Sequence, residues 1–597
     1  MGGGMSLQPE VADQGFITRR IIDCCLREDI RGVVSQGQLG PLPEALSPYL
    51  DHQPGAHWLR IAHLGADELW LPVVRAYPLQ DWIGTGDAWI KVSSQQPVEV
   101  QRGYSQWLGH LSQGLDEESL ALFAAYLKEA DCATEHRTLC NQAYHHCAPG
   151  LGDVIALKDW SQRLLKIDQL ASYLDHPFYP TARAKSGFDA AALKGYAPEF
   201  APRFELNWLA IPNQALTLTS PPPPHWPDFE EVGLSPTLHN SHSLLPVHPL
   251  TWNELEHYGL PEGTLRAPRT AMQVEPTLSV RTVVCIDQPQ WHLKLPLLVS
   301  TLGARNLRLI KPSTLYDGHW FQTTLMALAE LDTALASRYL HVDEKHGGHA
   351  DQSRHLAYIV RRYPSGLENT TLVPVAALAS PLTDGRLFLE QLVERFYAGS
   401  LQHWLNDYLD LLLQVHLRLW LHYGIALEAN QQNAVLIFEP GQPLRLLMKD
   451  NDAARLWPQR FAAACPDLAD LPTALQDERI RVDSTQPLAE MFCTITLQLN
   501  IVAIVEAIAV AGLSSRSSLY GSLRQRLMLC LEQLETDGIN CDDARLWLLD
   551  SPKLPVKYLL SAGSLLSKAH SGASDINKFY GYSAANFLLE EGACNAV

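Results

Sequence analysis

Leu278-Ser-Val-Arg-Thr-Val-Val-Cys-Ile286 and Trp291-His-Leu-Lys-Leu-Pro-Leu-Leu298 are two β-rich runs, separated by the turn-forming tetrapeptide Asp287-Gln-Pro-Gln290. This arrangement predicts an antiparallel hairpin. Hydrophobic residues recur at helical spacing in much of the remaining chain. A hairpin region between helical regions indicates an α+β fold rather than alternating βαβ units.

The register of this hairpin determines which side chains share a face. A turn centred in the tetrapeptide places Val283 opposite Lys294, and Ser279, Arg281 and Lys294 then lie on one face, because side chains alternate along a strand. A slip of one residue would break this alignment. Two cations on an otherwise apolar face are unfavourable unless an anion meets them, which favours phosphate or carboxylate binding. A solvated outer face is the alternative interpretation.

A second group of anion-binding candidates follows the predicted hairpin. The segment Ser300-Thr-Leu-Gly-Ala-Arg-Asn-Leu-Arg308 adds Thr301 and Arg305 directly after the strand. A hydroxyl, a glycine and a guanidinium group together suit an anion pocket.

A second hairpin is predicted by Ala434-Val-Leu-Ile-Phe438, the turn Glu439-Pro-Gly-Gln442 and Leu444-Arg-Leu-Leu-Met-Lys-Asp450. Asn433 precedes the first strand and Asp450 ends the second, so an antiparallel hairpin brings them to the same end. Amide and carboxylate oxygens meeting there are suited to Mg²⁺, which many ATP sites hold between one or two such ligands and the phosphates. The alternative is a polar loop cap followed by a surface aspartate.

Size and composition restrict the class of protein. The chain has 597 residues and a mass of 66.5 kDa, which predicts several domains. Hydrophobic residues make up 46% and charged residues 19%, so the chain is expected to be globular. The formal net charge of −19 makes general nucleic-acid binding unfavourable, although a cleft can still gather Arg and Lys.

The chain is predicted to have three parts. Residues 1–166 are expected to form a mainly helical N-terminal domain, with room for short strands between Trp82 and Val100. Residues 167–380 are expected to be β-rich, and residues 381–597 mostly helical around one short hairpin.

Two apolar segments of the last part are predicted to be helices. An amphipathic helix runs from Arg386 to Tyr423 and ends at Gly424, where a left-handed residue is favoured. The other segment extends from Phe492 to Leu513 and is interrupted by Gln498, Asn500 and Glu506. It falls short of a run of about 20 lipid-compatible residues. We therefore expect a buried helix and no membrane partner.

The cysteines and the first residues bear on the cellular compartment. Eleven scattered cysteines, an odd number, do not predict a disulfide framework, and the start Met1-Gly-Gly-Gly-Met-Ser-Leu-Gln8 lacks the basic and apolar regions of a secretory signal. We expect the reduced cytoplasm.

Common nucleotide and hydrolase motifs are missing from the sequence. It contains no Walker lysine motif, no G-x-G-x-x-G after a predicted strand, no H-E-x-x-H and no G-x-S-x-G. A chain of this kind that uses ATP must do so on a less common scaffold.

Several segments, in order, resemble the IucA/IucC family of siderophore synthetases, the type that is independent of non-ribosomal peptide synthetases. The resemblance covers about residue 170 to near the C-terminus. The matching segments are Asp175-His-Pro-Phe-Tyr-Pro-Thr-Ala-Arg-Ala-Lys185, Leu245-Pro-Val-His-Pro249, Pro276-Thr-Leu-Ser-Val-Arg-Thr282, Lys294 with Thr301 and Arg305, Glu428-Ala-Asn-Gln-Gln-Asn433, Lys449-Asp450 and Leu554-Pro-Val-Lys-Tyr-Leu559.

This resemblance implies a three-part cradle of thumb (1–166), fingers (167–380) and palm (381–597), with ATP and a carboxylate between fingers and palm. The implied reaction adenylates a polycarboxylic acid, citrate first, and condenses it with an amine or alcohol, releasing AMP and pyrophosphate. The alternative acids are 2-oxoglutarate or a citryl intermediate. A kinase-like phosphotransferase and a non-catalytic binder of ferric siderophore are the competing classes. A homodimer is also implied.

The resemblance assigns roles to individual residues. Ser279, Arg281, Lys294 and Arg305 are the implied catalytic residues. The implied ATP site consists of His176, Ser279, Arg281, Lys294, Asn433 and Asp450, of which Asn433 and Asp450 also hold Mg²⁺. The implied carboxylate site consists of Thr301, Arg305, Asn430 and Glu428.

Four positions depart from the family pattern. Tyr179 stands where the first signature has its second histidine, and Arg183 stands at its lysine position. Asn430 replaces the histidine of E-x-H-x-Q-N, and Lys449 replaces an arginine. Because asparagine can hydrogen-bond but cannot carry a proton or a positive charge, Asn430 puts in question which acid is activated, or how efficiently.

Overall fold

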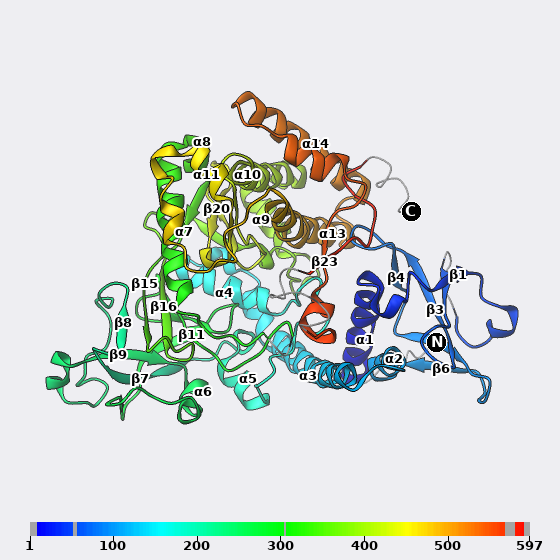
Figure 1. Cartoon of the computed structure of the whole chain (residues 1–597), viewed down its shortest axis with the longest axis horizontal. Helices are drawn as coiled ribbons and strands as arrows, with labels where there is room; N and C mark the ends of the chain where they lie inside the picture. Colours follow the sequence, from blue (N-terminus) through cyan, green and yellow to red (C-terminus); the bar gives the residue numbers. More distant parts are fainter. Residues whose placement is uncertain (1–8, 52–55, 304–305, 568–578, 590–597) are drawn as a thin grey trace.

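The computed structural model describes residues 9–51, 56–303, 306–567 and 579–589, and it is a mixed α+β structure built on three main sheets. Figure 1 shows the N-terminal sheet and its helices at one end of the molecule, the largest sheet at the other, and the C-terminal helices above them. The predicted α+β class is confirmed.

The N-terminal sheet has six antiparallel strands in the order β1-β2-β3-β5-β6, with β4 paired to β3. Its apolar face packs on three helices. The strands are β1 (Gln38–Gly40), β2 (His57–Ile61), β3 (Glu68–Arg75), β4 (Trp82–Gly84), β5 (Ala88–Val92) and β6 (Glu99–Arg102), and the helices are α1 (Pro9–Arg27), α2 (Tyr104–Leu111) and α3 (Glu117–Cys147).

This sheet adds strands to the predicted mainly helical N-terminal part, in which strands were expected only between Trp82 and Val100. Strand β3 is buried on both faces: Leu69 and Leu71 pack toward the helices, and Trp70 packs in a second cluster with Trp58 and Ile90. A strand buried on both faces shows no alternation of apolar and polar residues, so its sequence does not reveal the period of a strand.

The largest sheet has nine antiparallel strands in the order β10-β7-β11-β12-β13-β16-β15-β8, with β9 paired to β7. The strands are β7 (Phe204–Pro212), β8 (Leu216–Leu218), β9 (His242–Val247), β10 (Leu265–Arg266), β11 (Ala271–Pro276), β12 (Thr282–Cys285), β13 (Trp291–Lys294), β15 (Asp343–Ala350) and β16 (Ala357–Arg362). The helices near it are α4 (Trp160–Ser172), α5 (Ala190–Tyr196), α6 (Pro249–Trp252) and α7 (Ser313–Leu331), of which α7 packs on β15.

The first predicted hairpin is present as β12 and β13, but the predicted register is wrong by one residue. Thr282, not Val283, lies opposite Lys294, and the N–H of Leu295 donates to the carbonyl of Arg281 at 2.9 Å. The loop includes Ile286 besides the turn tetrapeptide, because the N–H of Gln288 donates to the carbonyl of Cys285 at 3.2 Å and the N–H of Trp291 donates to the carbonyl of Gln288 at 2.9 Å. The loop therefore begins one residue earlier than the turn residues indicate.

The third sheet has the order β14-β20-β19-β17, and it contains the second predicted hairpin. Its strands are β14 (Tyr339–His341), β17 (Thr371–Pro374), β19 (Ala434–Phe438) and β20 (Arg445–Met448). Ala434 pairs with Met448, so the hairpin prediction is confirmed. The sheet joins strands from both sides of residue 380, so the predicted boundary there runs through a shared sheet.

The predicted helix from Arg386 to Tyr423 is two helices, α9 (Phe388–Tyr397) and α10 (Leu401–Leu421). Ala398 and Gly399 lie between them with φ of 49° and 80°, and the hydroxyl of Ser400 accepts a hydrogen bond from the N–H of His403 at the start of α10. The apolar period continues across the break, which hides it in the sequence. Gly424 ends α10 with φ of 65°, as predicted.

The remaining C-terminal elements surround α10. They are α8 (Thr333–Ala336), α11 (Pro458–Ala464), α12 (Gln486–Met491), the π-helix Phe492–Val502, α13 (Ala503–Val510), α14 (Arg516–Thr536), α15 (Asp542–Ala544) and the short strands β18 (Ile425–Ala426), β21 (Arg455–Leu456), β22 (Val556–Lys557) and β23 (Tyr580–Gly581). Among the described residues, only the continuous helix Gln486–Val510 is long and apolar enough to cross a membrane, and 72% of its apolar window is buried inside the protein. The predicted buried helix is thereby confirmed.

Candidate functional site

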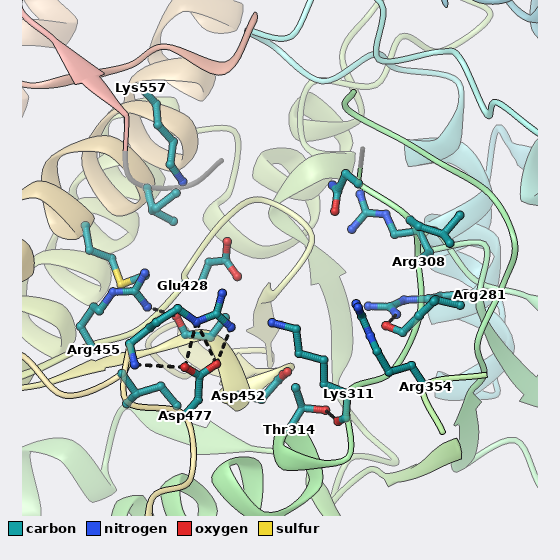
Figure 2. A pocket seen from close by; sticks show the side chains of 18 of the residues that line it. Arg281, Arg308, Lys311, Thr314, Arg354, Glu428, Asp452, Arg455, Asp477 and Lys557 are labelled. Carbon is teal, nitrogen blue, oxygen red and sulfur yellow. Dashed lines mark hydrogen bonds and ion pairs between the residues drawn. The ribbon is translucent and has the colours of Figure 1, made fainter. Parts of the chain in front are cut away.

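A cavity of about 270 Å³ lies between loops that connect strands of the largest sheet and loops of the C-terminal region (Figure 2). Seven cationic side chains and three carboxylates line it. The cations are Arg281, Arg308, Lys311, Arg354, Arg455, Arg479 and Lys557, and the carboxylates are Glu428, Asp452 and Asp477. The cavity is therefore basic within a chain whose formal net charge is −19.

Arg281 and Arg308 are the two most informative of these cations. Arg281 Nη1 donates to the carbonyl of Leu309 at 2.9 Å, and Arg308 Nε donates to Thr301 Oγ1 at 2.5 Å. Within the described part of the chain, neither guanidinium group forms an ion pair with a carboxylate. Burial lowers the pKa of both, that of Arg308 to about 10. Such an arrangement favours an anionic ligand, because buried charges are normally paired.

Lys294, predicted to contact ATP, is held by Asp450. Its Nζ lies 2.6 Å from Asp450 Oδ1, which also lies 2.7 Å from Arg361 Nη2. Burial alone would raise the pKa of Asp450, but Arg361 and Lys294 outweigh it and keep that pKa far below its usual value. Arg361 also contacts Glu344 at 2.7 Å. The pair of Lys294 and Asp450 thus joins β13 to the end of β20, beside the cavity rather than on its lining.

Ser279 and Thr301 support the loops that carry the cavity arginines. Ser279 Oγ accepts a hydrogen bond from the N–H of Thr282 at 3.1 Å, in a turn where Val280 has φ of 64°. Thr301 Oγ1 accepts from Arg308. Arg305, also predicted for this site, lies outside the described residues.

The loop of Glu428 to Asn433 leads directly into β19. Asn430 Oδ1 accepts hydrogen bonds from the N–H groups of Gln432 and Asn433, at 3.0 and 2.9 Å. Asn433 Nδ2 donates to the carbonyl of Glu428 at 3.1 Å, and its own carbonyl accepts from the N–H of Lys449, next to Asp450. The side-chain oxygen of Asn430 therefore shapes the loop that brings Glu428 to the cavity.

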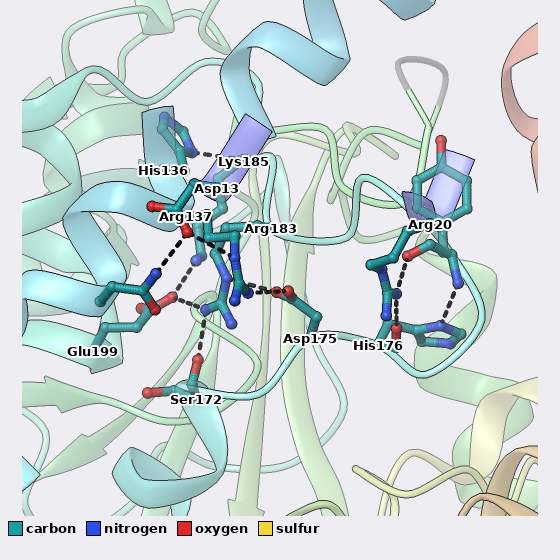
Figure 3. Close-up of polar contacts among 12 residues, drawn as sticks. Asp13, Arg20, His136, Arg137, Ser172, Asp175, His176, Arg183, Lys185 and Glu199 are labelled. Carbon is teal, nitrogen blue, oxygen red and sulfur yellow. Dashed lines mark hydrogen bonds and ion pairs between the residues drawn. The ribbon is translucent and has the colours of Figure 1, made fainter. Parts of the chain in front are cut away.

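His176 is held in one tautomer by its own loop. Its Nδ1 accepts from the N–H groups of Phe178 and Tyr179, at 3.2 and 3.0 Å, so the neutral ring carries its proton on Nε2. Burial and the nearby Arg20 lower its pKa to about 3. Arg20, on α1, donates to the carbonyls of His176, Tyr179 and Pro180 at 2.5, 2.8 and 3.2 Å (Figure 3).

The charged residues near His176 in the sequence belong to a buried ionic network and do not line the cavity (Figure 3). Asp175 contacts Arg183 Nε at 2.7 Å and Arg137 Nη1 at 2.9 Å. Glu199 contacts Arg183 Nη1 at 3.0 Å and Lys185 Nζ at 2.5 Å. Arg183, at the family's lysine position, thus binds protein carboxylates and is unavailable to a ligand.

Tyr179, at the family's second histidine position, also points away from the cavity. Its hydroxyl donates to Glu129 Oε1 at 2.7 Å and lies 2.9 Å from Ser564 Oγ. Of the predicted site residues, Arg281 and Glu428 therefore line the cavity. Thr301 and Lys294 do not line it but contact two residues that do, Arg308 and Asp452.

Sequence reasoning did not single out five of the lining cations. These are Arg308, Lys311, Arg354, Arg455 and Arg479. Arg308 ends the segment noted after the first hairpin, and Lys557 lies in the late segment noted for its resemblance, but the others stand in stretches without a motif. Nothing local in the sequence distinguishes these residues from surface lysines and arginines.

The described residues contain no group of three or more His, Cys, Asp or Glu side chains placed to hold a metal ion. Glu428 and Asp452 are lining carboxylates of the hard-oxygen kind that Mg²⁺ prefers. Mg²⁺ fits here only in the manner of phosphate-bound ions, with one or two protein carboxylates and the remaining ligands from the nucleotide and water.

Two protein families match separate parts of the chain. Residues 163–380 match the IucA / IucC family, and residues 402–569 match the family described as ferric iron reductase FhuF-like transporter. Staphyloferrin B synthase of Staphylococcus aureus is 22% identical over 590 residues, covering 92% of this chain and 91% of that protein. The L-2,3-diaminopropanoate–citrate ligase of the same organism is 26% identical over 317 residues, covering 48% of this chain and 53% of that protein.

Two solved structures share the fold. The petrobactin biosynthesis protein AsbB of Bacillus anthracis superposes with a TM-score of 0.75 at 15% identity, over 98% of this chain and 96% of that one. ATP-bound aerobactin synthetase IucA of Klebsiella pneumoniae superposes with a TM-score of 0.67 at 17% identity, over 98% of this chain and all of that one. The family match spans the turn and strand that carry Arg281 and Lys294, and the full-length relative and both structures agree with it. Residues 163–380 thus match the IucA/IucC family, and the whole chain is similar to a siderophore synthase along its length.

Proposed function

We propose that this chain is an ATP-dependent siderophore synthetase that adenylates a polycarboxylic acid, citrate first, and condenses it with an amine or alcohol. The observation that carries the proposal is the cavity in which Arg281, Arg308 and Arg354 form no ion pair with any described carboxylate. Relatives named staphyloferrin B synthase and diaminopropanoate–citrate ligase support this reaction class.

The proposed chemistry explains why the cavity needs cations more than it needs a base. A carboxylate is a poor acyl donor, because an attacking amine would have to expel oxide. Attack of a carboxylate oxygen on the α-phosphorus of ATP releases pyrophosphate and gives an acyl-adenylate, and attack of the acceptor on the acyl carbon then releases AMP. Negative charge gathers at the α-phosphorus in the first step, where Arg281 and Arg308 would stabilise it.

Each remaining residue has a proposed place in this scheme. The ion pair of Lys294 and Asp450 would fix the largest sheet and the third sheet relative to each other beside the phosphates. His176 would present Nε2–H to the nucleotide. Mg²⁺, when bound, would neutralise phosphate charge, and the predicted Asn433 and Asp450 would hold it. Arg305 and Asn430 keep their predicted contacts to the acid. Because the Oδ1 atom of Asn430 already accepts two N–H groups, its Nδ2 would make that contact.

The test is an assay of the purified chain with ATP, Mg²⁺ and a panel of polycarboxylates, using hydroxylamine as the acceptor. We expect AMP, pyrophosphate and a hydroxamate with citrate, and loss of all three products in Arg281→Ala. Arg60→Ala is the matched control, since Arg60 pairs with Glu68 on the N-terminal sheet. Release of ADP would instead indicate a kinase-like phosphotransferase. Absence of nucleotide consumption with every acid would leave a non-catalytic binder of ferric siderophore.

The proposal includes a cytoplasmic location and a homodimer. Light scattering of the purified chain and fractionation of the producing cell test these two statements separately from the reaction.

A further inference from the structure

The two walls of the cavity differ in charge. The wall built by residues 281–354 contributes Arg281, Arg308, Lys311 and Arg354 and no carboxylate. The wall built by residues 428–557 contributes both signs: Glu428, Asp452 and Asp477 together with Arg455, Arg479 and Lys557 (Figure 2). The first wall suits a polyanion. The second would repel a polyanion in part, and it suits a molecule that carries both an ammonium and a carboxylate group.

Asp477 belongs to the structure of the second wall. Its Oδ1 accepts from Arg479 Nε at 2.8 Å and from the N–H of Arg479 at 3.0 Å. The hydrogen bond from Arg479 lowers the pKa of Asp477 to about 2. The Asp477 carboxylate is therefore already paired with a protein cation.

Glu428 and Asp452 are different. Among the described residues, no cation lies within ion-pair distance of Glu428, and Asp452 has only Lys294, whose Nζ is 3.9 Å away. Both carboxylates line the cavity. They are therefore placed to receive an ammonium group.

Arg455 is the corresponding receptor for a carboxylate. Its Nη1 donates to the carbonyls of Ala453 and Ala454, at 3.4 and 3.0 Å, and no described carboxylate forms an ion pair with it. A guanidinium group has five N–H donors, so the others remain available in the cavity. Arg455 on β21 lies opposite Ala426 on β18, two residues before Glu428. Arg455 and Glu428 thus lie on or directly after one small pair of strands, and Asp452 lies shortly before β21.

Apolar side chains complete the wall. Ile480, Met491 and Ile495 line the cavity beside these charges and would contact the carbon chain of a ligand. We propose that this wall is the acceptor subsite, and that it binds an amine that also bears a carboxylate, an amino acid with a nucleophilic side-chain or α-amino group. Glu428 and Asp452 bind the ammonium end and Arg455 binds the carboxylate. This inference rests on the proposed function for the role of the ligand, but not for its binding.

The test compares matched acceptors by direct binding, without ATP. The pairs are 2,3-diaminopropanoate with 1,2-diaminoethane, and ornithine with putrescine; each pair differs only by a carboxylate. Titration calorimetry should give the amino acid of each pair at least about tenfold tighter binding, the range for one charged hydrogen-bonded contact. Arg455→Gln should remove this preference, and Asp452→Asn should weaken both members of a pair. Arg445→Gln is the control, because Arg445 lies on β20 and is paired with Glu439. This variant should bind all four ligands as the unmodified chain does.

Equal or tighter binding of the diamines, or an unchanged preference in Arg455→Gln, would overturn the subsite. The hydroxylamine assay needs no natural acceptor, so it reports on the proposed function alone. Preferential binding of the amino acids with no hydroxamate would reject adenylation and keep the subsite. Hydroxamate formation with preference for the diamines would do the opposite.

Discussion

Two groups of cations in this chain contrast with each other. In the ionic network near His176, three cations form ion pairs with three carboxylates. Arg137, Arg183 and Lys185 contact Asp13, Asp175 and Glu199 at 2.5 to 3.0 Å. In the cavity, Arg281, Arg308 and Arg354 form no ion pair with any described carboxylate. A cation paired with a protein carboxylate supports the fold, whereas a cavity cation without such a partner is a place for an anionic ligand.

The pKa values follow the same division. Burial alone would raise the pKa of Asp175, but Arg183, Arg20 and Arg137 outweigh it and the pKa is lowered. Burial of Arg281 and Arg308 is not outweighed, and their pKa values are lowered. The network is electrostatically complete without a ligand, and the cavity is not.

The largest expected effect is on the stability of the network. Arg183→Met leaves the buried carboxylates of Asp175 and Glu199 without their shared cation, so it should lower the free energy of unfolding by about 3–5 kcal/mol. Denaturant unfolding measures this change. Arg60→Met, which breaks a half-exposed pair with Glu68, should lower the free energy of unfolding far less, because solvent screens that pair. Similar losses in both variants would contradict the contrast.

The next effect is on turnover. Arg281→Ala and Arg308→Ala should each lower kcat/KM for acyl-adenylate formation by about 10²–10³-fold, equal to about 2.7–4 kcal/mol of barrier, by analogy with other transition-state anion donors. By resemblance, Arg305→Ala should behave in the same way. Neither Arg281→Ala nor Arg308→Ala should lower the unfolding temperature, because neither removes an ion pair with a described carboxylate. Full turnover in the Arg281 and Arg308 variants would remove their assignment.

A polyanion should complete the cavity and stabilise the chain. At a concentration one hundred times its Kd, inorganic pyrophosphate should raise the free energy of unfolding by about 2.7 kcal/mol. Thermal unfolding with and without pyrophosphate measures this. The shift should be smaller in Arg308→Ala, and it should decrease with added salt because the contacts are electrostatic. A shift of equal size in Arg308→Ala would place pyrophosphate elsewhere.

The smallest effect concerns pH. His176 has a folded-state pKa of about 3 and an unfolded pKa near 6.5, so the unfolded chain takes up the proton first. Its share of stability is complete above about pH 6.5 and is lost by about 1.4 kcal/mol per unit as the pH falls toward 3. Unfolding measured at pH 7, 6 and 5 should show a shallower slope in His176→Gln than in the unmodified chain. Asp175 and Glu199, whose pKa values are lowered, should add a further loss only below about pH 4.

Local patterns predicted a substantial part of the fold. Both hairpins, the end of α10 at Gly424 and the buried helix after Gln486 are present. Each depends on turn residues or hydrophobic periods within about 20 positions. The errors have local causes too: the loop of the first hairpin includes the strand-like residue Ile286, and the apolar period continues through the break at Ala398.

The sequence by itself determined the residue types of the site: an arginine at 281, a glutamate at 428 and two hairpins that present them. Only the tertiary structure decided which cations are free to bind a ligand. Arg183 and Arg281 have the same side chain and both stand in recognised segments, yet one is surrounded by carboxylates and the other is not. The partner of a charge is chosen over long distances along the chain, as with Lys294 and Asp450, which are 156 positions apart. Folding brings such groups together, and no short-range pattern encodes the pairing.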